Sequence, residues 1–152
     1  GESTTLYRSG TPTVALASSL ALALELAVEQ LPQHWEAVRK ANAFLRAELS
    51  RYPKVRINSP ESAIPQILNL SVQDVKGTVF QRALDEKGVC VSVKSACASD
   101  GMPSRAVFAV SRDRRNALSS WRISLSHLTT EEELRGFLAA FDACYRELTE
   151  TH

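Results

Sequence analysis

A single cysteine in a loop of small residues is the part of the sequence best suited to chemistry. Cys97 lies in the run Ser95-Ala96-Cys97-Ala98-Ser99, between a β-branched segment and a segment rich in Asp, Gly and Pro. This composition is typical of a strand that ends in a loop. The small neighbours cannot bury the thiol, and Lys94 would favour its reactive thiolate form if the loop brings the two together. Cys97 is therefore a candidate nucleophile, and the alternative is a loop residue that happens to be cysteine.

A second candidate site precedes the first expected helix. Arg8, Ser9, Gly10 and Thr11 come directly before Pro12, and proline suits the first turn of a helix. A guanidinium, hydroxyl groups and free backbone N–H groups at a helix start together suit an anion such as phosphate. On the residues alone, an exposed loop that caps the helix is the favoured interpretation over an anion site.

The third candidate is an arginine inside an expected strand. Residues 119–125 alternate apolar and polar side chains, with Trp121 and Ile123 on one face and Arg122 on the other, which indicates a strand. The planar fork of arginine can hold a carboxylate with two hydrogen bonds. Taken alone, however, Arg122 is better explained as a residue on a solvated face.

The hydrophobic periodicity of the chain predicts an α+β domain. The expected sheet is small and mainly antiparallel, and helices pack on one of its faces. Its strands are predicted at residues 54–58, 66–72, 89–93 and 119–125. Helices are predicted at residues 12–30, 35–49 after a break at Pro32, 77–87, 104–110 and from Thr130 onward, where Thr130 and Glu133 form a capping box.

Several residues are predicted to belong to the core. The apolar run from Val14 to Val28 is shorter than the roughly 20 residues that span a bilayer, so we interpret it as a buried helix rather than a membrane helix. In the helix at 77–87, Val79, Phe80 and Leu84 form the inward face. Free cysteines are among the most buried residues, and Cys90 and Cys144 are both predicted to be packed core thiols.

The length, composition and net charge of the chain fit one soluble domain of residues 1–152. The chain carries 18 Lys and Arg against 17 Asp and Glu, for a net charge of +1, with the charges interspersed along helical faces. This pattern favours a solvated surface over nucleic-acid or membrane binding. Three distant cysteines without a CxxC or Cys/His cluster argue against disulfides and a metal site, and favour a reducing cytoplasm. No basic region followed by an apolar run and a cleavage site is visible, so a secretory signal is not expected. The start at Gly1 suggests a piece of a longer protein, and a processed tag is the alternative.

Three segments of this sequence, taken together, resemble a known family. They are RSGTPT at 8–13, VSVKSACAS at 91–99 followed by Pro103-Ser104, and WRISLSHLTTEEEL at 121–134. In this order and spacing they resemble the C-terminal part of cysteine desulfurases of the NifS/IscS type, which are class V, pyridoxal-phosphate-dependent enzymes. The resemblance covers nearly the whole chain and implies that the chain is similar to the small domain of fold-type I enzymes of this cofactor.

The resemblance implies a role for each candidate residue. Cys97 matches the nucleophile that takes sulfur from cofactor-bound L-cysteine, which leaves L-alanine and a protein persulfide. Arg122 matches the residue that holds the substrate carboxylate. Thr11 matches the threonine that reaches the cofactor phosphate in the partner subunit of a homodimer. The family passes its sulfur to an acceptor protein, for example in iron–sulfur cluster assembly.

The match leaves alternatives open, because the family's cofactor lysine lies in a segment that this sequence lacks. None of the five lysines, Lys40, Lys54, Lys76, Lys87 and Lys94, has a matching context. The isolated chain is therefore expected to be inactive. A related class V aminotransferase, a selenocysteine lyase, and a non-catalytic sulfur carrier or interaction module are the other hypotheses.

Overall fold

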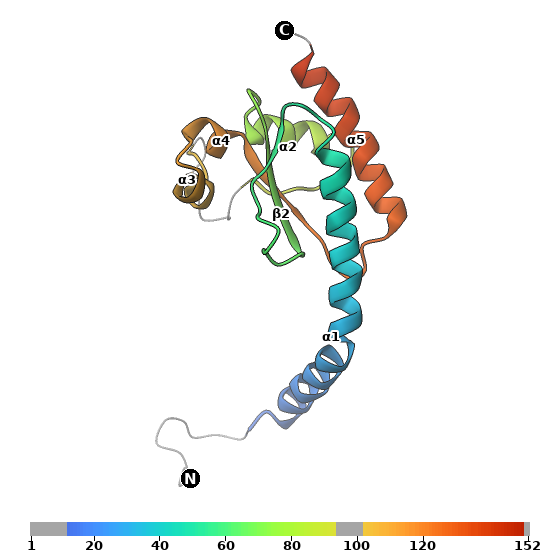
Figure 1. Cartoon of the computed structure of the whole chain (residues 1–152). Helices are drawn as coiled ribbons and strands as arrows, with labels where there is room; N and C mark the ends of the chain where they lie inside the picture. The colour runs from blue at the N-terminus through green and yellow to red at the C-terminus, as the bar shows by residue number, and fades with distance from the viewer. Residues whose placement is uncertain (1–11, 94–101, 151–152) are drawn as a thin grey trace. The chain divides into compact units, whose positions relative to one another are not determined.

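The computed structural model describes residues 12–93 and 102–150. Five helices and three strands lie in these ranges (Figure 1). In chain order they are α1 (Val14–Leu49), β1 (Val55–Ile57), β2 (Ile67–Val72), α2 (Gly77–Asp85), α3 (Arg105–Ser111), α4 (Arg114–Ser119), β3 (Ser120–Ser124) and α5 (Glu131–Thr149). The chain divides into two compact units, Gly1–His34 and Trp35–His152, and all three strands belong to the second.

The sheet is antiparallel, with strand order β1-β2-β3. This confirms the predicted α+β class and antiparallel pairing. The predicted strand at 89–93 is wrong: only Ser92 pairs with β3, through a bridge to Arg122 in which the two residues exchange backbone hydrogen bonds of 3.1 and 2.7 Å. The reason lies just upstream, where Gly88 turns the chain at φ 77° and the valines that follow pack against the core instead of extending a ladder.

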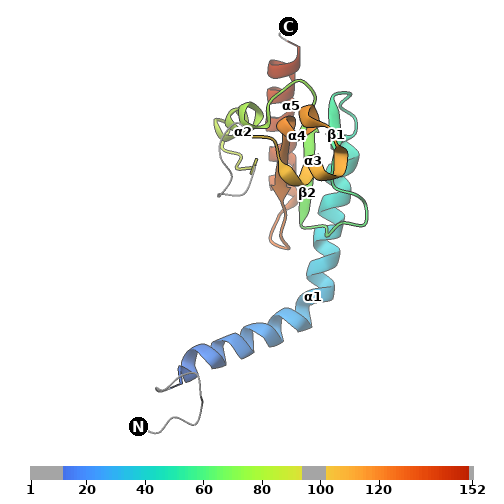
Figure 2. The same cartoon turned by 90° about the vertical axis from the view of Figure 1, so that its left-hand side faces the viewer.

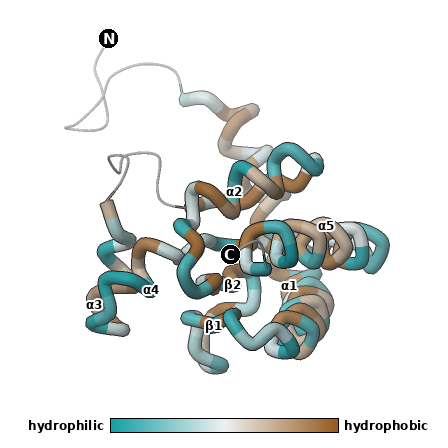
Figure 3. Tube along the Cα trace, turned by 90° about the horizontal axis from the view of Figure 1, so that it is seen from above, coloured by the Kyte–Doolittle hydropathy of each residue, from teal (hydrophilic) through white to brown (hydrophobic). Residues whose placement is uncertain are grey.

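One face of the sheet carries the main core. Leu68, Leu70 and Val72 of β2 are fully buried there, next to Trp121 of β3. They are covered by α2, α5 and the part of α1 that follows Trp35, as Figures 1 and 3 show. Aromatic rings fill the centre: Phe141 lies 5.2 Å from the Phe80 ring and 6.1 Å from the Trp121 ring, between ring centroids. Burial of each such side chain stabilises the fold by about 1.5–3 kcal/mol.

The opposite face of the sheet carries two short helices. Asn69 and Ser71 alternate with the core residues of β2 and point to this side, where the Ser71 hydroxyl donates to the Asn116 carbonyl of α4 at 3.1 Å. Figures 2 and 3 show α3 and α4 on the side of β2 away from α1 and α5. The predicted layer on one face is therefore present, and α3 and α4 add a partial layer on the other.

The long helix α1 differs from the two helices predicted for this region. It continues through Pro32. Proline removes one backbone hydrogen bond of the helix, but the residues around it are mostly good helix formers. Leu16, Leu20 and Leu24 stay 63–71% exposed, so the predicted burial of this run is not found within the described chain. By length and composition alone α1 could cross a membrane, a test that core helices of soluble proteins also pass.

The cysteines and the last helix test the remaining core predictions. Cys144 is fully buried, as predicted, whereas Cys90 is exposed and its predicted burial is wrong. Val89 and Val91 pack against the core, and because side chains alternate in an extended segment, Cys90 between them points away from it. Val79 is also 45% exposed rather than inward. The predicted capping box of α5 is present, with the Glu133 backbone N–H donating to the Thr130 hydroxyl at 3.2 Å.

Candidate functional site

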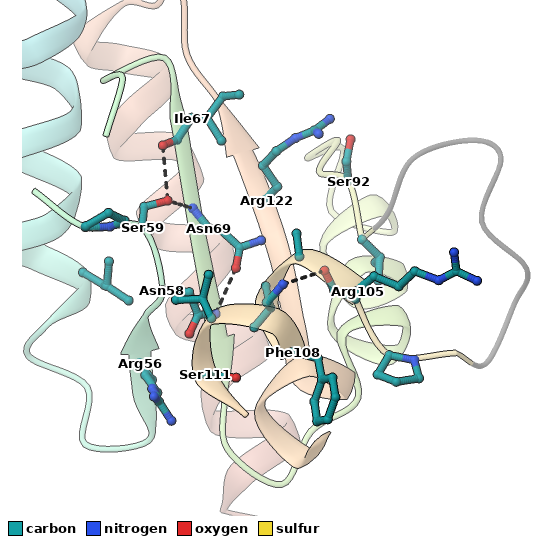
Figure 4. Close-up of a pocket in the computed structure, with 18 of the residues that line it drawn as sticks. Arg56, Asn58, Ser59, Ile67, Asn69, Ser92, Arg105, Phe108, Ser111 and Arg122 are labelled. Atoms are coloured by element: carbon teal, nitrogen blue, oxygen red, sulfur yellow. Dashed lines mark hydrogen bonds between the residues drawn. The ribbon is translucent and has the colours of Figure 1, made fainter. Parts of the chain in front are cut away.

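A pocket of about 990 Å³ lies on the face of the sheet away from the core. Its floor is formed by the three strands and by the residues that follow β1, and α3 forms a wall (Figure 4). The volume lies within the range of pockets that bind small molecules. The strands contribute the polar side chains of Arg56, Asn69 and Arg122, and the loops and α3 contribute others, whereas Val107 and Phe108 of α3 are apolar.

Arg122 enters this pocket from the middle of β3. Its neighbours Trp121 and Ile123 point into the core at 0% and 7% exposure, so the period of two in a strand directs Arg122 to the opposite face. The side chain is half-buried, and its Nε is buried without a hydrogen-bond partner among the described residues. A buried donor without a partner costs stability, and a bound anion would satisfy it.

The charge of the lining favours an anion. Arg56, Arg105 and Arg122 line the pocket, and no Asp or Glu is among the described residues that do so. Of these three arginines, Arg56 alone forms an ion pair with another described residue: it lies 3.5 Å from Asp113, which does not line the pocket. Because the lining is positive and partly apolar, it suits a small molecule that carries a carboxylate or a phosphate.

Two of the three predicted site residues lie outside the described residues. Nothing is described of Thr11 or Cys97, nor of Lys94. The described residues on either side of the Cys97 segment, Val93 and Met102, both line the pocket. The segment that carries Cys97 is therefore joined at both ends to the wall of the pocket that contains Arg122.

The described lining does not fit pyridoxal phosphate on its own. Enzymes of this cofactor hold it on a lysine, and none of the described lysines, Lys40, Lys54, Lys76 and Lys87, lines the pocket. Likewise, no group of three or more His, Cys, Asp or Glu that could hold a metal ion occurs within residues 12–93 and 102–150. What this part of the chain offers is anion binding by arginine.

Sequence reasoning missed several residues of the pocket. Asn58, Asn69 and Ser92 line it beside Arg122, and Figure 4 shows Asn69 and Arg122 on neighbouring strands, on the same side of the sheet. The alternation of β2 does direct Asn69 away from Leu68 and Leu70, which is a signal in the sequence. Its significance depends on the pairing of Asn69 with Arg122, and strand pairing is not encoded in a local pattern.

Comparison with known proteins identifies the class. The family model of class V aminotransferases matches residues 1–137, so the chain belongs to this family.

Its relatives include cysteine desulfurases. The cysteine desulfurase IscS of Clostridium botulinum (strain Hall) is 30% identical over 132 residues, which cover 84% of this chain and 33% of the relative. That of Dictyoglomus turgidum is 31% identical over 144 residues, which cover 93% and 36%. The X-ray structure of the NifS-like protein from Rickettsia africae matches with a TM-score of 0.75 at 27% identity, over 91% of this chain and 36% of that one. The chain thus spans about a third of the length of these relatives.

Proposed function

We propose that this chain is the C-terminal domain of a cysteine desulfurase, in which Cys97 is the nucleophile and Arg122 holds the carboxylate of L-cysteine. The observation that carries the proposal is the pocket itself. It contains an arginine whose buried Nε has no partner among the described residues, and its lining includes Val93 and Met102, which flank the segment that bears Cys97. The relatives named cysteine desulfurase support the same activity.

Arg122 would orient the substrate. A guanidinium is always charged and presents a rigid fork of donors, so it binds a carboxylate in a defined direction. Fixing the carboxylate on β3 leaves the thiol of the substrate free to face another part of the pocket. Val93 and Met102, the described residues on either side of the Cys97 segment, both line the pocket, which supports the proposal that the Cys97 thiol reaches that position.

The reaction balances as a transfer of one sulfur atom. The Cys97 thiolate attacks the sulfur of the substrate, an S–S bond forms, and the Cβ–S bond of the substrate breaks. Its electron pair stays on Cβ, which takes a proton, so the products are L-alanine and a persulfide on Cys97. Pyridoxal phosphate, when bound, supplies the electron sink that labilises the substrate. Its lysine would come from outside the described residues, and Thr11 would contact its phosphate across a homodimer.

The proposed reaction sets a requirement on the Cys97 thiol. A nucleophile that takes sulfur in the pocket and then passes it to an acceptor protein must reach two places. A run of Ser, Ala, Asp and Gly around Cys97 offers little steric hindrance to that movement. We place the protein in the cytoplasm, where reducing conditions keep such a thiol free.

The test uses the complete protein with added pyridoxal phosphate and measures L-alanine and sulfide formed from L-cysteine. Cys97→Ser should abolish both products, since serine cannot accept sulfur in this step. Cys90→Ser is the matched control: it removes an exposed thiol seven residues earlier in the chain and should leave turnover unchanged. Turnover that persists in Cys97→Ser contradicts the proposal. The chain of residues 1–152 alone should form neither product.

One observation favours a second candidate, a non-catalytic sulfur carrier. No described lysine lines the pocket, whereas a persulfide carrier needs only the thiol. Mass spectrometry of residues 1–152 after exposure to a persulfide donor would distinguish the two. Sulfur added at Cys97, together with a complete protein that forms no L-alanine, supports the carrier.

A further inference from the structure

A chain of side-chain amides fixes the orientation of Asn69. Asn116 of α4 is 7% exposed and donates from Nδ2 to Asn58 Oδ1 at 2.9 Å. Asn58 Nδ2 then donates to Asn69 Oδ1 at 2.9 Å and to the Ser71 hydroxyl at 2.8 Å. Each amide is thus set by the one before it. Because Asn69 Oδ1 is the acceptor at the end of this chain, its Nδ2 must be the donor on the other side.

The backbone around Asn69 is equally well held. Its N–H donates to the Ser59 hydroxyl at 2.8 Å, and its carbonyl accepts from the backbone N–H groups of Asn58 and Ser59 at 2.8 and 3.2 Å. Figure 4 shows the first of these contacts and the Asn58 amide beside it. Asn69 therefore has little freedom to rotate, and its direction is set before any ligand arrives.

Asn69 lies directly beside Arg122. The two residues are partners in the β2–β3 register, so their side chains are on the same face and their Cβ atoms are about 5 Å apart. Both line the pocket. No described residue accepts a hydrogen bond from Asn69 Nδ2 or from Arg122 Nε. Two donors on neighbouring strands, one neutral and one charged, thus belong to the lining of the same pocket and have no acceptor among the described residues.

We infer that Asn69 Nδ2 and the Arg122 guanidinium form a two-donor site for one carboxylate group. The inference rests on the proposed function for the identity of the ligand, an α-amino acid such as L-cysteine. A planar carboxylate has two oxygens that can accept from two neighbouring donors at once. Asn69 is then a specificity residue: it restricts the rotation of a carboxylate that Arg122 alone would leave free to turn.

The test is a titration of the ¹⁵N-labelled chain of residues 1–152, followed by NMR of the side-chain amides. L-cysteine and L-alanine are the probes, and cysteamine, which lacks the carboxylate, is the matched ligand control. The Asn69 amide protons should shift with both amino acids and stay in place with cysteamine. The Asn42 amide is the internal reference, because it is buried and donates to the Pro65 carbonyl at 2.8 Å.

Substitutions at Asn69 and at Asn58, which donates to Asn69 Oδ1, test the inference further. Asn69→Asp replaces the donor by a carboxylate and should weaken binding of both amino acids by about tenfold or more. Asn58→Asp keeps both donors but removes the group that donates to Asn69 Oδ1. The Asn69 amide should then turn its Nδ2 toward that new acceptor, so its protons move downfield without ligand, and L-cysteine binding weakens.

Three results would overturn the inference: equal binding by Asn69→Asp and the wild type, equal binding of cysteamine and L-alanine, or no amino-acid binding by the wild-type chain. None of them depends on sulfur transfer. Carboxylate binding that survives while the complete protein forms no L-alanine refutes the proposed function alone. Turnover that depends on Cys97, but not on Asn69, refutes this inference alone.

Discussion

Replacing Arg122 by methionine should make the protein more stable while it removes the ability to bind L-cysteine. In the structure Arg122 Nε is buried without a partner among the described residues, and an unsatisfied buried donor costs about 1–3 kcal/mol. Methionine keeps the length of the apolar stem that packs along β3 and has no donor. Because the Arg122 side chain is only half-buried, the lower part of the range applies. We expect the free energy of unfolding to rise by about 1 kcal/mol.

Urea unfolding of residues 1–152 measures this change as a shift of the midpoint at constant m-value. Arg56→Met is the matched control, since Arg56 also lines the pocket but is paired with Asp113 at 3.5 Å, and both side chains are over 40% exposed. Loss of that surface ion pair should change stability by about 0–1 kcal/mol in the unfavourable direction. If Arg122→Met destabilises the protein more than Arg56→Met does, Arg122 stabilises the fold. That result would refute the argument that Arg122 is an unsatisfied donor that binds an anion.

Two further predictions concern stability. Gly77→Ala should destabilise the protein by about 1–3 kcal/mol, because an added Cβ would clash with the backbone carbonyl of Ser120 at the start of β3. Gly136→Ala in α5 should stabilise the protein by about 1 kcal/mol, because the added Cβ meets no atom within 4 Å. Thermal unfolding of both variants checks this pair, and equal effects of the two substitutions would contradict it. Burial raises the pKa of the Cys144 thiol, so this thiol stays protonated to a higher pH in the folded chain than in the unfolded chain. The stability due to Cys144 is therefore fully present below the unfolded thiol pKa of about 8.5 and is lost as the pH rises through the raised folded pKa. Urea midpoints of wild type and Cys144→Ala across this range should converge as the pH rises, and parallel curves would contradict the expectation.

Much of the local structure could be predicted because it depends on neighbouring residues. The capping box of Thr130 and Glu133 defines where α5 begins, and the alternation around Trp121 defines which face of β3 is buried. Predictions failed where distant contacts compete with local preference. The valines after Gly88 have strand propensity, but only Ser92 finds a pairing partner there. Cys90 is exposed because its neighbours Val89 and Val91 are the residues that pack against the core.

The direction of Arg122, away from the core, follows from the local pattern alone, because successive side chains of a strand alternate between two faces. The class of chemistry could likewise be predicted from the resemblance of the sequence to cysteine desulfurases. The residues that lie beside Arg122 depend on the three-dimensional fold. The register of β2 against β3 brings Asn69 next to it, and a hydrogen bond from α4 to Asn58 decides which end of the amides faces the pocket. Such a donor pair is made by strands and a helix far apart in the chain, and long-range pairing depends on how the whole core packs.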